Sequence, residues 1–215
     1  MANKQTQEVE LKFLINKKDS EDIAGFLERL GKPTECIQIA NYYFDTANKD
    51  LHQHKIGLRI RRWNDQSEQT VKMAGTQIGA MSQRPEYNVN YAGMIPKLDL
   101  FPSDIWPQTI NTEALQGELR EQFRIDFQRQ RWLIDIGSST IEVAIDQGAI
   151  FAEAKKINSK QVWQEPICEL EAELISGSIT DLLQFSEILT KEFTLEPGPL
   201  SKAQRGFMLA EKIDG

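Results

Sequence analysis

The first stretch of the chain with side chains able to do chemistry is Glu8–Phe13, where charged and apolar residues alternate. Successive side chains of an extended strand point to opposite faces, so Glu8, Glu10 and Lys12 share one face. Alternation of this kind is also typical of an ordinary half-buried strand whose charges lie in water. The stretch therefore indicates a function only if other strands repeat the pattern.

Later strand candidates repeat it and bring both signs of charge to one face. The cations on this face are Lys12, Arg59, Arg61, Lys72, Arg84, Arg129 and Arg131, and the acids are Glu8, Glu10, Glu86, Asp146, Glu169, Glu171 and Glu173. Guanidinium groups suit bidentate contacts to phosphate oxygens. Clustered carboxylates suit hard cations such as Mg²⁺ or Mn²⁺. The pattern predicts a site for a polyphosphate together with a divalent metal ion.

The elements that must position these charges are mainly antiparallel strands with flanking helices. About eight strand candidates joined mostly by short turns predict a closed eight-stranded β-barrel. Amphipathic helices near 20–30, 112–123 and 180–193 would cover outward-facing apolar residues, which leaves a charged lumen. A helical insertion at about 95–125 interrupts the strands, and a short final helix is expected from Ser201. We expect residues 1–215 to form a single domain.

Composition excludes several classes of protein. A net charge of −7 disfavours a general nucleic-acid binder, which needs a basic surface. The chain lacks a run of ~18 apolar residues and an apolar N-terminal signal, so we expect no membrane span and a cytoplasmic location. Cys36 and Cys168 belong to no CxxC pair, so neither a zinc site nor a disulfide framework is indicated. Composition does not indicate an oligomeric state.

Glu8-x-Glu10-x-Lys12 resembles the ExExK signature of the CYTH-domain proteins, the triphosphate tunnel metalloenzymes. Companion motifs follow in the expected order: Tyr42-Tyr43-Phe44-Asp45-Thr46, Leu58-Arg59-Ile60-Arg61, Thr70-Val71-Lys72, Arg84-x-Glu86, Arg129 and Arg131, Ile145-Asp146, Glu169-Leu170-Glu171, and Ser201-Lys202. Within the family, the stretches 83–89, 165–171 and 200–206 are similar to the bacterial inorganic triphosphatase branch. Members of that branch usually carry a C-terminal helical CHAD domain, which we expect to be absent from this chain.

The resemblance implies hydrolysis of tripolyphosphate to pyrophosphate and phosphate with Mg²⁺ or Mn²⁺. By position, the implied phosphate ligands are Lys12, Arg59, Arg61, Lys72, Arg84, Arg129, Arg131 and Lys202. The implied metal ligands are Glu8, Glu10, Asp146, Glu169 and Glu171, with Glu8, Lys12 and Glu171 as catalytic residues. Alternatives are an adenylyl cyclase or a thiamine triphosphatase on the same tunnel, although no feature marks a site for adenine or thiamine. The non-catalytic alternative is a polyphosphate-binding module.

Overall fold

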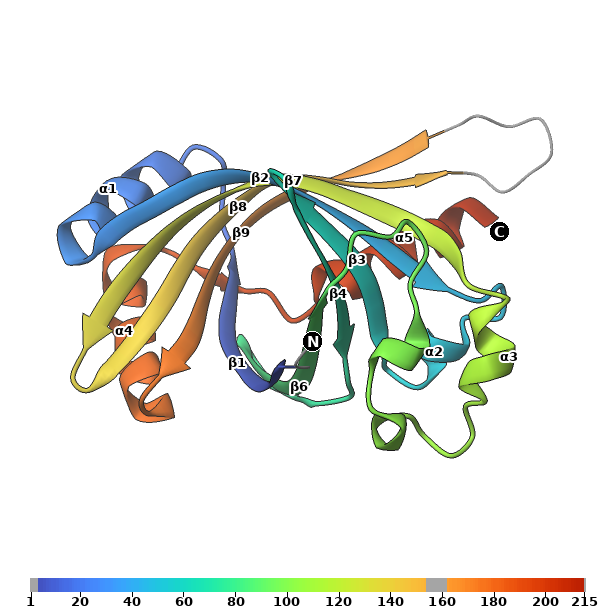
Figure 1. Ribbon diagram of the computed structural model, residues 1–215. Coiled ribbons are helices and arrows are strands. Elements are labelled where there is room, and N and C mark those ends of the chain that lie inside the picture. The colour runs from blue at the N-terminus through green and yellow to red at the C-terminus, as the bar shows by residue number, and fades with distance from the viewer. Residues whose placement is uncertain (1–3, 154–161, 215) are drawn as a thin grey trace.

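The computed structural model describes residues 4–153 and 162–214, and its strands form one antiparallel sheet that closes on itself (Figure 1). Strand β1 pairs with β9 along one edge and with β6 along the other, so the cycle runs β1-β9-β8-β7-β2-β3-β4-β6. The predicted closed eight-stranded barrel is thereby confirmed. The barrel strands are β1 (Lys4–Leu14), β2 (Lys32–Asp45), β3 (Gly57–Trp63), β4 (Gln66–Lys72), β6 (Met81–Asn90), β7 (Arg120–Ile136), β8 (Ser139–Glu153) and β9 (Val162–Ser176). Two short strands, β5 (Thr76–Ile78) and β10 (Glu196–Pro197), extend the sheet beside β6 and β1.

Two helices cover the outer surface on one side of the barrel, α1 (Ser20–Leu30) and α4 (Ile179–Glu192) (Figure 1). They bury Leu27 and Phe185 against outward residues such as Trp132 on β7. The helices are amphipathic because their apolar residues recur at helical spacing and face the sheet. No helix in the described part of the chain is long and apolar enough to cross a membrane.

On the opposite side, the insertion between β6 and β7 packs with α2 (Asp50–Gln53) over the outer faces of β3 and β4. It consists of two 3-10 turns, η1 (Leu98–Leu100) and η2 (Ser103–Ile105), followed by α3 (Thr112–Gln116). The helix predicted over 112–123 is thus shorter than expected, and Phe123 lies in β7. A helix fits the spacing of Leu115, Leu119 and Phe123. Phe123 also fits the period-two alternation of a strand, and it forms a strand here because β7 pairs with β2 along much of its length.

The last helix, α5 (Lys202–Asp214), is longer than predicted and packs on the inner face of the barrel. Phe207 and Ile213 contact an apolar region to which Ile39, Phe127 and Ile150 contribute. By alternation, Phe127 shares its face with Arg129, so these apolar residues point inward. The expectation that the apolar strand faces all lie outside is therefore wrong for this part of the barrel, because α5 supplies an inner apolar surface.

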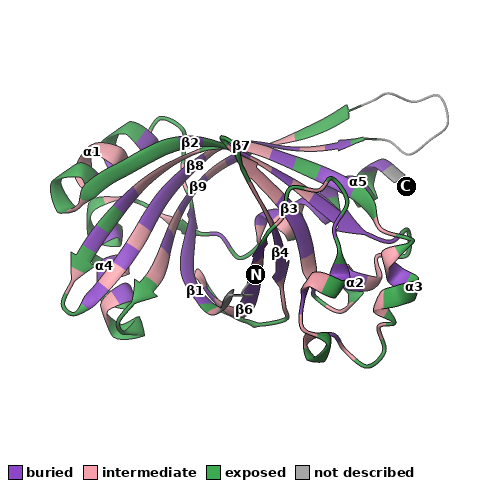
Figure 2. Ribbon diagram, viewed as in Figure 1, coloured by how far each residue is buried: buried purple, intermediate pink, exposed green. Residues whose placement is uncertain are grey.

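Buried residues occur along most barrel strands, whereas exposed residues gather on the helices and loops (Figure 2). The buried set includes many charged side chains, among them Glu8, Glu10, Lys12, Arg59, Asp146 and Glu169. Buried charges are tolerated only when they are paired, hydrated or bound by a ligand. The fold therefore places inside the barrel the charged groups whose removal from water costs the most free energy.

Candidate active site in the barrel lumen

The lumen contains a cavity of about 750 Å³ with charged walls. Ten of the predicted site residues line it: Glu8, Glu10, Lys12, Arg59, Arg61, Lys72, Arg84, Arg129, Glu171 and Lys202. Glu86 and Glu173, which the strand pattern placed on the same face, line it as well. The structure does not bring Asp146, Glu169 or Arg131 to the cavity wall; Arg131 instead pairs with Glu35 and Glu142. One cavity thus unites most charges predicted from six separate strands.

Strand register explains why opposite charges meet. Glu8 on β1 is the direct partner of Arg84 on β6, and Lys12 is the direct partner of Glu171 on β9. Residues directly opposite one another in antiparallel strands have side chains close enough to interact. The ladder therefore fixes these pairs before any ligand arrives.

One wall of the cavity is acidic and includes Glu8, Glu10 and Glu173. Glu8 binds Lys72 at 2.5 Å and Arg84 at 2.9 Å, and Arg84 also reaches Glu10 at 3.3 Å. Burial, together with neighbouring carboxylates, raises the pKa of Glu10. Among the described residues, no three carboxylate, imidazole or thiol groups are gathered closely enough to hold a metal ion. Instead, Lys72 and Arg84 form ion pairs with Glu8, and Arg84 also pairs with Glu10.

Glu173 is the acid of this wall whose negative charge is least offset by neighbouring cations. It lies directly opposite Glu10 across β1 and β9, and among the described residues it has no ion-pair partner within 4.0 Å. Burial and the nearby charge of Glu8 raise the pKa of Glu173 to about 7. The sequence indicated that Glu173 shares the face of Glu171 but did not predict it as a site residue.

The elevated pKa of Glu173 predicts a pH-dependent stability. Between pH 4.5 and 7 the folded chain binds more protons here than the unfolded chain, so the free energy of unfolding falls as pH rises. Glu173→Gln should raise that free energy at pH 8 by about 1–2 kcal/mol, allowing for solvent at this half-buried side chain, and change it little at pH 4. Urea unfolding of both proteins at the two pH values measures the difference. An equal effect at both would contradict the assignment.

The opposite wall is rich in guanidinium groups. Arg61 donates from its Nε to Asn41 Oδ1 at 3.0 Å, but among the described residues it has no carboxylate within 4.0 Å. Burial, together with Arg59 and Arg129, lowers the pKa of Arg61 to about 10. The Nε of Arg59 is buried and has no hydrogen-bond partner in the part of the chain that the structure describes. Buried donors left unpaired are costly, so this wall is suited to receive an anion.

Below these walls lies a network of ion pairs around Lys202. Its Nζ lies 2.8 Å from Asp146, 2.7 Å from Glu169 and 2.6 Å from Glu171. Arg129 binds Asp146 and Glu171, while Arg205 binds Glu169 at 2.6 Å. Asp146 and Glu169 are fully buried. The network anchors the start of α5 inside the barrel.

Besides Glu173, sequence reasoning did not single out Arg205 or Asn41. Arg205 lies one helical turn after Lys202, a spacing that could have indicated a second cation on the same face of α5. Asn41 occupies the inward face of β2 between Ile39 and Tyr43, and a polar residue in that alternation was the available signal.

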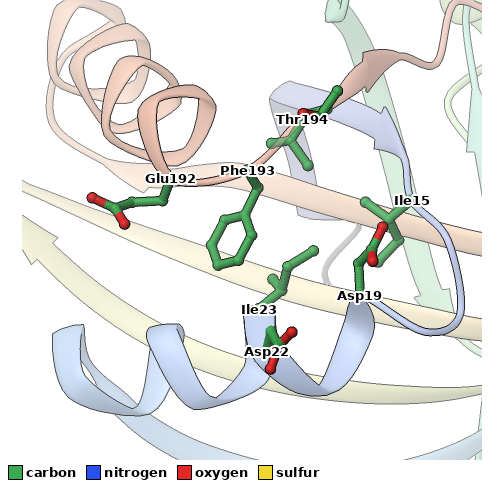
Figure 3. A pocket seen from close by; sticks show the side chains of 8 residues that line it. Ile15, Asp19, Asp22, Ile23, Glu192, Phe193 and Thr194 are labelled. Atoms are coloured by element: carbon green, nitrogen blue, oxygen red, sulfur yellow. The ribbon is translucent and has the colours of Figure 1, made fainter.

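A second cavity, of about 190 Å³, lies outside the barrel between α1 and the segment after α4. Figure 3 shows Phe193 and Ile23 pointing toward each other within it, with Asp19, Asp22 and Glu192 nearby. None of the eight described residues lining it is a lysine or arginine. It lacks the charges that would bind a phosphate.

Comparison with known proteins agrees with this geometry. The model of a family described as the CYTH domain matches residues 6–207. An inorganic triphosphatase from Haemophilus influenzae is 31% identical over 213 residues, which is 99% of this chain and 57% of that relative. The chain therefore spans little more than half of the relative's length.

Solved structures show the same fold at low identity. A Hippeastrum protein, described as a putative adenylyl cyclase with a dominant triphosphatase activity, is 16% identical, with 97% of each chain covered and a TM-score of 0.62. A putative adenylate cyclase from Bacillus halodurans is 21% identical, with 94% of this chain and 98% of the other covered and a TM-score of 0.62.

Proposed function

Because this chain belongs to the CYTH domain family, we propose that it is a metal-dependent inorganic triphosphatase, which hydrolyses tripolyphosphate to pyrophosphate and phosphate inside its barrel. The observation that carries the proposal is Arg61, a half-buried side chain that lines the cavity and, among the described residues, has no carboxylate within 4.0 Å. The inorganic triphosphatase activity of the Haemophilus influenzae relative supports the same substrate.

The cations have a direct role in this proposal. Phosphoryl transfer requires mainly that the reacting group be positioned and its negative charge neutralised. Arg61 and Arg59 offer guanidinium donors from β3, and Lys12 lines the same cavity from β1, where burial lowers its pKa. We assign phosphate binding to Lys12, Arg59, Arg61, Lys72, Arg84, Arg129, Arg131 and Lys202. Arg131 would contribute from outside the cavity wall.

The acidic wall fits a hard divalent cation by the chemistry of its donors. Burial and neighbouring carboxylates raise the pKa values of Glu10 and Glu173, so a dication would relieve repulsion there. We propose that Glu8, Glu10, Glu171 and Glu173 hold Mg²⁺ or Mn²⁺. Asp146 and Glu169, predicted as further ligands, are enclosed by Lys202, Arg129 and Arg205, and we propose that they hold these cations in place.

The reaction then needs a water molecule oriented toward the terminal phosphorus atom. A bound divalent ion would make such a water more acidic and would offset phosphate charge. Glu8 and Glu171 are the two carboxylates that we propose orient the water, and Lys12 lies directly opposite Glu171 in the β1–β9 ladder. Lys72 and Arg84, which now bind Glu8, would transfer their donors to phosphate oxygens.

The metal assignment predicts the effect of one substitution. Glu10→Gln should weaken binding of Mn²⁺ alone by about tenfold or more, because it removes one anionic ligand from the acidic wall. Glu142→Gln is the matched control, since Glu142 pairs with Arg131 and does not line the cavity. Calorimetric titration with Mn²⁺ measures both. Equal affinities for the two variants would remove Glu10 from the ligand set.

The function itself is tested by phosphate release from tripolyphosphate, ATP and thiamine triphosphate, each with Mg²⁺, with Mn²⁺ and with EDTA. We expect metal-dependent release that strongly favours tripolyphosphate. A preference for ATP or thiamine triphosphate would replace the proposed substrate. Tight binding of tripolyphosphate without release would leave a polyphosphate-binding module.

A further inference from the structure

The arginines of the lumen differ in what holds them. Arg84 is tied to Glu8 and Glu10, and Arg129 to Asp146 and Glu171. Arg59 has Glu86 at 3.8 Å. Arg61, by contrast, is held by the neutral amide of Asn41, whose Oδ1 accepts from Arg61 Nε at 3.0 Å. Within the described part of the chain, Arg61 is thus the lumen arginine without a carboxylate within 4.0 Å; Glu68, its partner across β3 and β4, acts on it only from farther away.

The orientation of the Asn41 amide follows from hydrogen-bonding chemistry. Arginine Nε can only donate, so Asn41 must present its oxygen to it and turn its Nδ2 away. Asn41 and Arg61 are direct partners across β2 and β3, and Asn41 is fully buried. Its Nδ2 has no hydrogen-bond partner among the described residues, so this orientation has an energetic cost that the contact with Arg61 offsets only in part.

The contact engages Nε, on one edge of the guanidinium, and among the described residues no carboxylate lies within 4.0 Å of the terminal nitrogen atoms. Arg61 lines the cavity, whereas Asn41 is not among the residues of its wall. Because the acceptor engages Nε, the terminal nitrogen atoms of Arg61 remain for a ligand, in a planar fork that matches phosphate oxygens. A carboxylate in the same place would fix the same direction but would also neutralise the charge.

We propose that Asn41 is a positioning residue that orients Arg61 toward a phosphate group of the substrate without pairing its positive charge with a carboxylate. This inference rests on the proposed function, since the ligand it concerns is tripolyphosphate. An asparagine at this position separates two effects, orientation and neutralisation, that an aspartate would combine.

Asn41→Asp tests the charge. The new carboxylate would lie beside Arg61 with almost unchanged shape, so the melting temperature should equal or exceed that of wild type. Affinity for tripolyphosphate in EDTA, measured by calorimetry, should fall by about 10- to 100-fold, because Arg61 is now paired. Asn88→Asp is the control: it adds the same charge at a residue that lines the cavity, next to Glu86 rather than Arg61, and should weaken binding far less.

Asn41→Leu tests the orientation. It removes the acceptor, retains a similar volume and leaves the charge of Arg61 in place, so affinity should stay within about threefold while kcat falls at least about tenfold. If Asn41 had a purely structural role, both variants would have lower melting temperatures. Asn41→Asp would then not lose affinity selectively, and Asn41→Leu would not lose kcat selectively.

The outcomes separate the two proposals. Wild type that binds no tripolyphosphate would overturn the proposed function and this inference with it. If wild type binds tripolyphosphate, an affinity of Asn41→Asp within threefold of the wild-type value would overturn the role of Asn41 alone. Equal losses of affinity in Asn41→Asp and Asn88→Asp would do the same. If Asn41→Asp does not fold, the kcat and affinity of Asn41→Leu decide.

Discussion

Replacing Arg61 with alanine should lower kcat/KM for tripolyphosphate by about 10²–10³-fold, the loss expected when one preorganised charged donor is removed from a buried site. Arg61 is the strongest candidate because its side chain is half-buried, lines the cavity and has no carboxylate within 4.0 Å in the described structure. Among the described residues, no directly paired carboxylate therefore competes with the substrate for its charge.

The same substitution should not destabilise the fold. A half-buried cation without a direct carboxylate partner costs desolvation free energy, so its removal should leave the melting temperature unchanged or raise it. Steady-state hydrolysis and thermal unfolding of one preparation measure the two effects together. A rise in stability with a fall in activity is typical of a residue retained for function.

Arg62→Ala is the matched control, because Arg62 is the next residue on β3 but faces outward. Its guanidinium lies over the Tyr42 ring at 5.5 Å and donates to the carbonyl oxygen of Gly93. We expect activity within about twofold of wild type, as for surface substitutions away from a site. Similar losses in both variants would mean that Arg61 acts through strand stability rather than through phosphate binding.

Strand alternation predicted the charged lumen well, for a physical reason. A period of two places every second side chain on one face, and direct cross-strand pairing then brings Lys12 to Glu171 without further information. Closure of the barrel could also be predicted, because two apolar outer surfaces and matching amphipathic helices leave the charges only an interior position.

Depth within the lumen could not be predicted in this way. The stagger of strands in a barrel decides which level each charge occupies, and alternation carries no information on stagger. Asp146 and Arg131 both lie on inward faces, yet one is fully buried beneath Lys202 and the other pairs with Glu35, which is exposed. The inner apolar surface around Phe127 was missed for a related reason, since a strand face can change from apolar to charged along its length.

Lys202→Met should destabilise the protein by about 3–5 kcal/mol, the cost of removing one partner from a buried ion pair. Lys202 binds three carboxylates, and Asp146 and Glu169 are fully buried, so the variant leaves uncompensated negative charges inside the barrel. Methionine retains the length of the side chain, which limits any contribution from an empty cavity. Unfolding in urea at pH 8 measures the loss, and Lys212→Met, on the same helix and exposed, should stay within about 0.5 kcal/mol of wild type.

The loss should shrink as the pH is lowered. Burial alone would raise the pKa of Glu171, but Lys202 and Arg129 hold it well below its usual value in wild type. That contribution to stability is present above pH 4.5 and is lost as pH falls toward the pKa of the folded state. In the variant the carboxylates lose a cation and protonate more readily, so acid relieves their repulsion. The stability difference between the two proteins should therefore be smaller at pH 4.5 than at pH 8. A difference that stays constant across this range would mean that lost packing, rather than charge, accounts for the effect of Lys202.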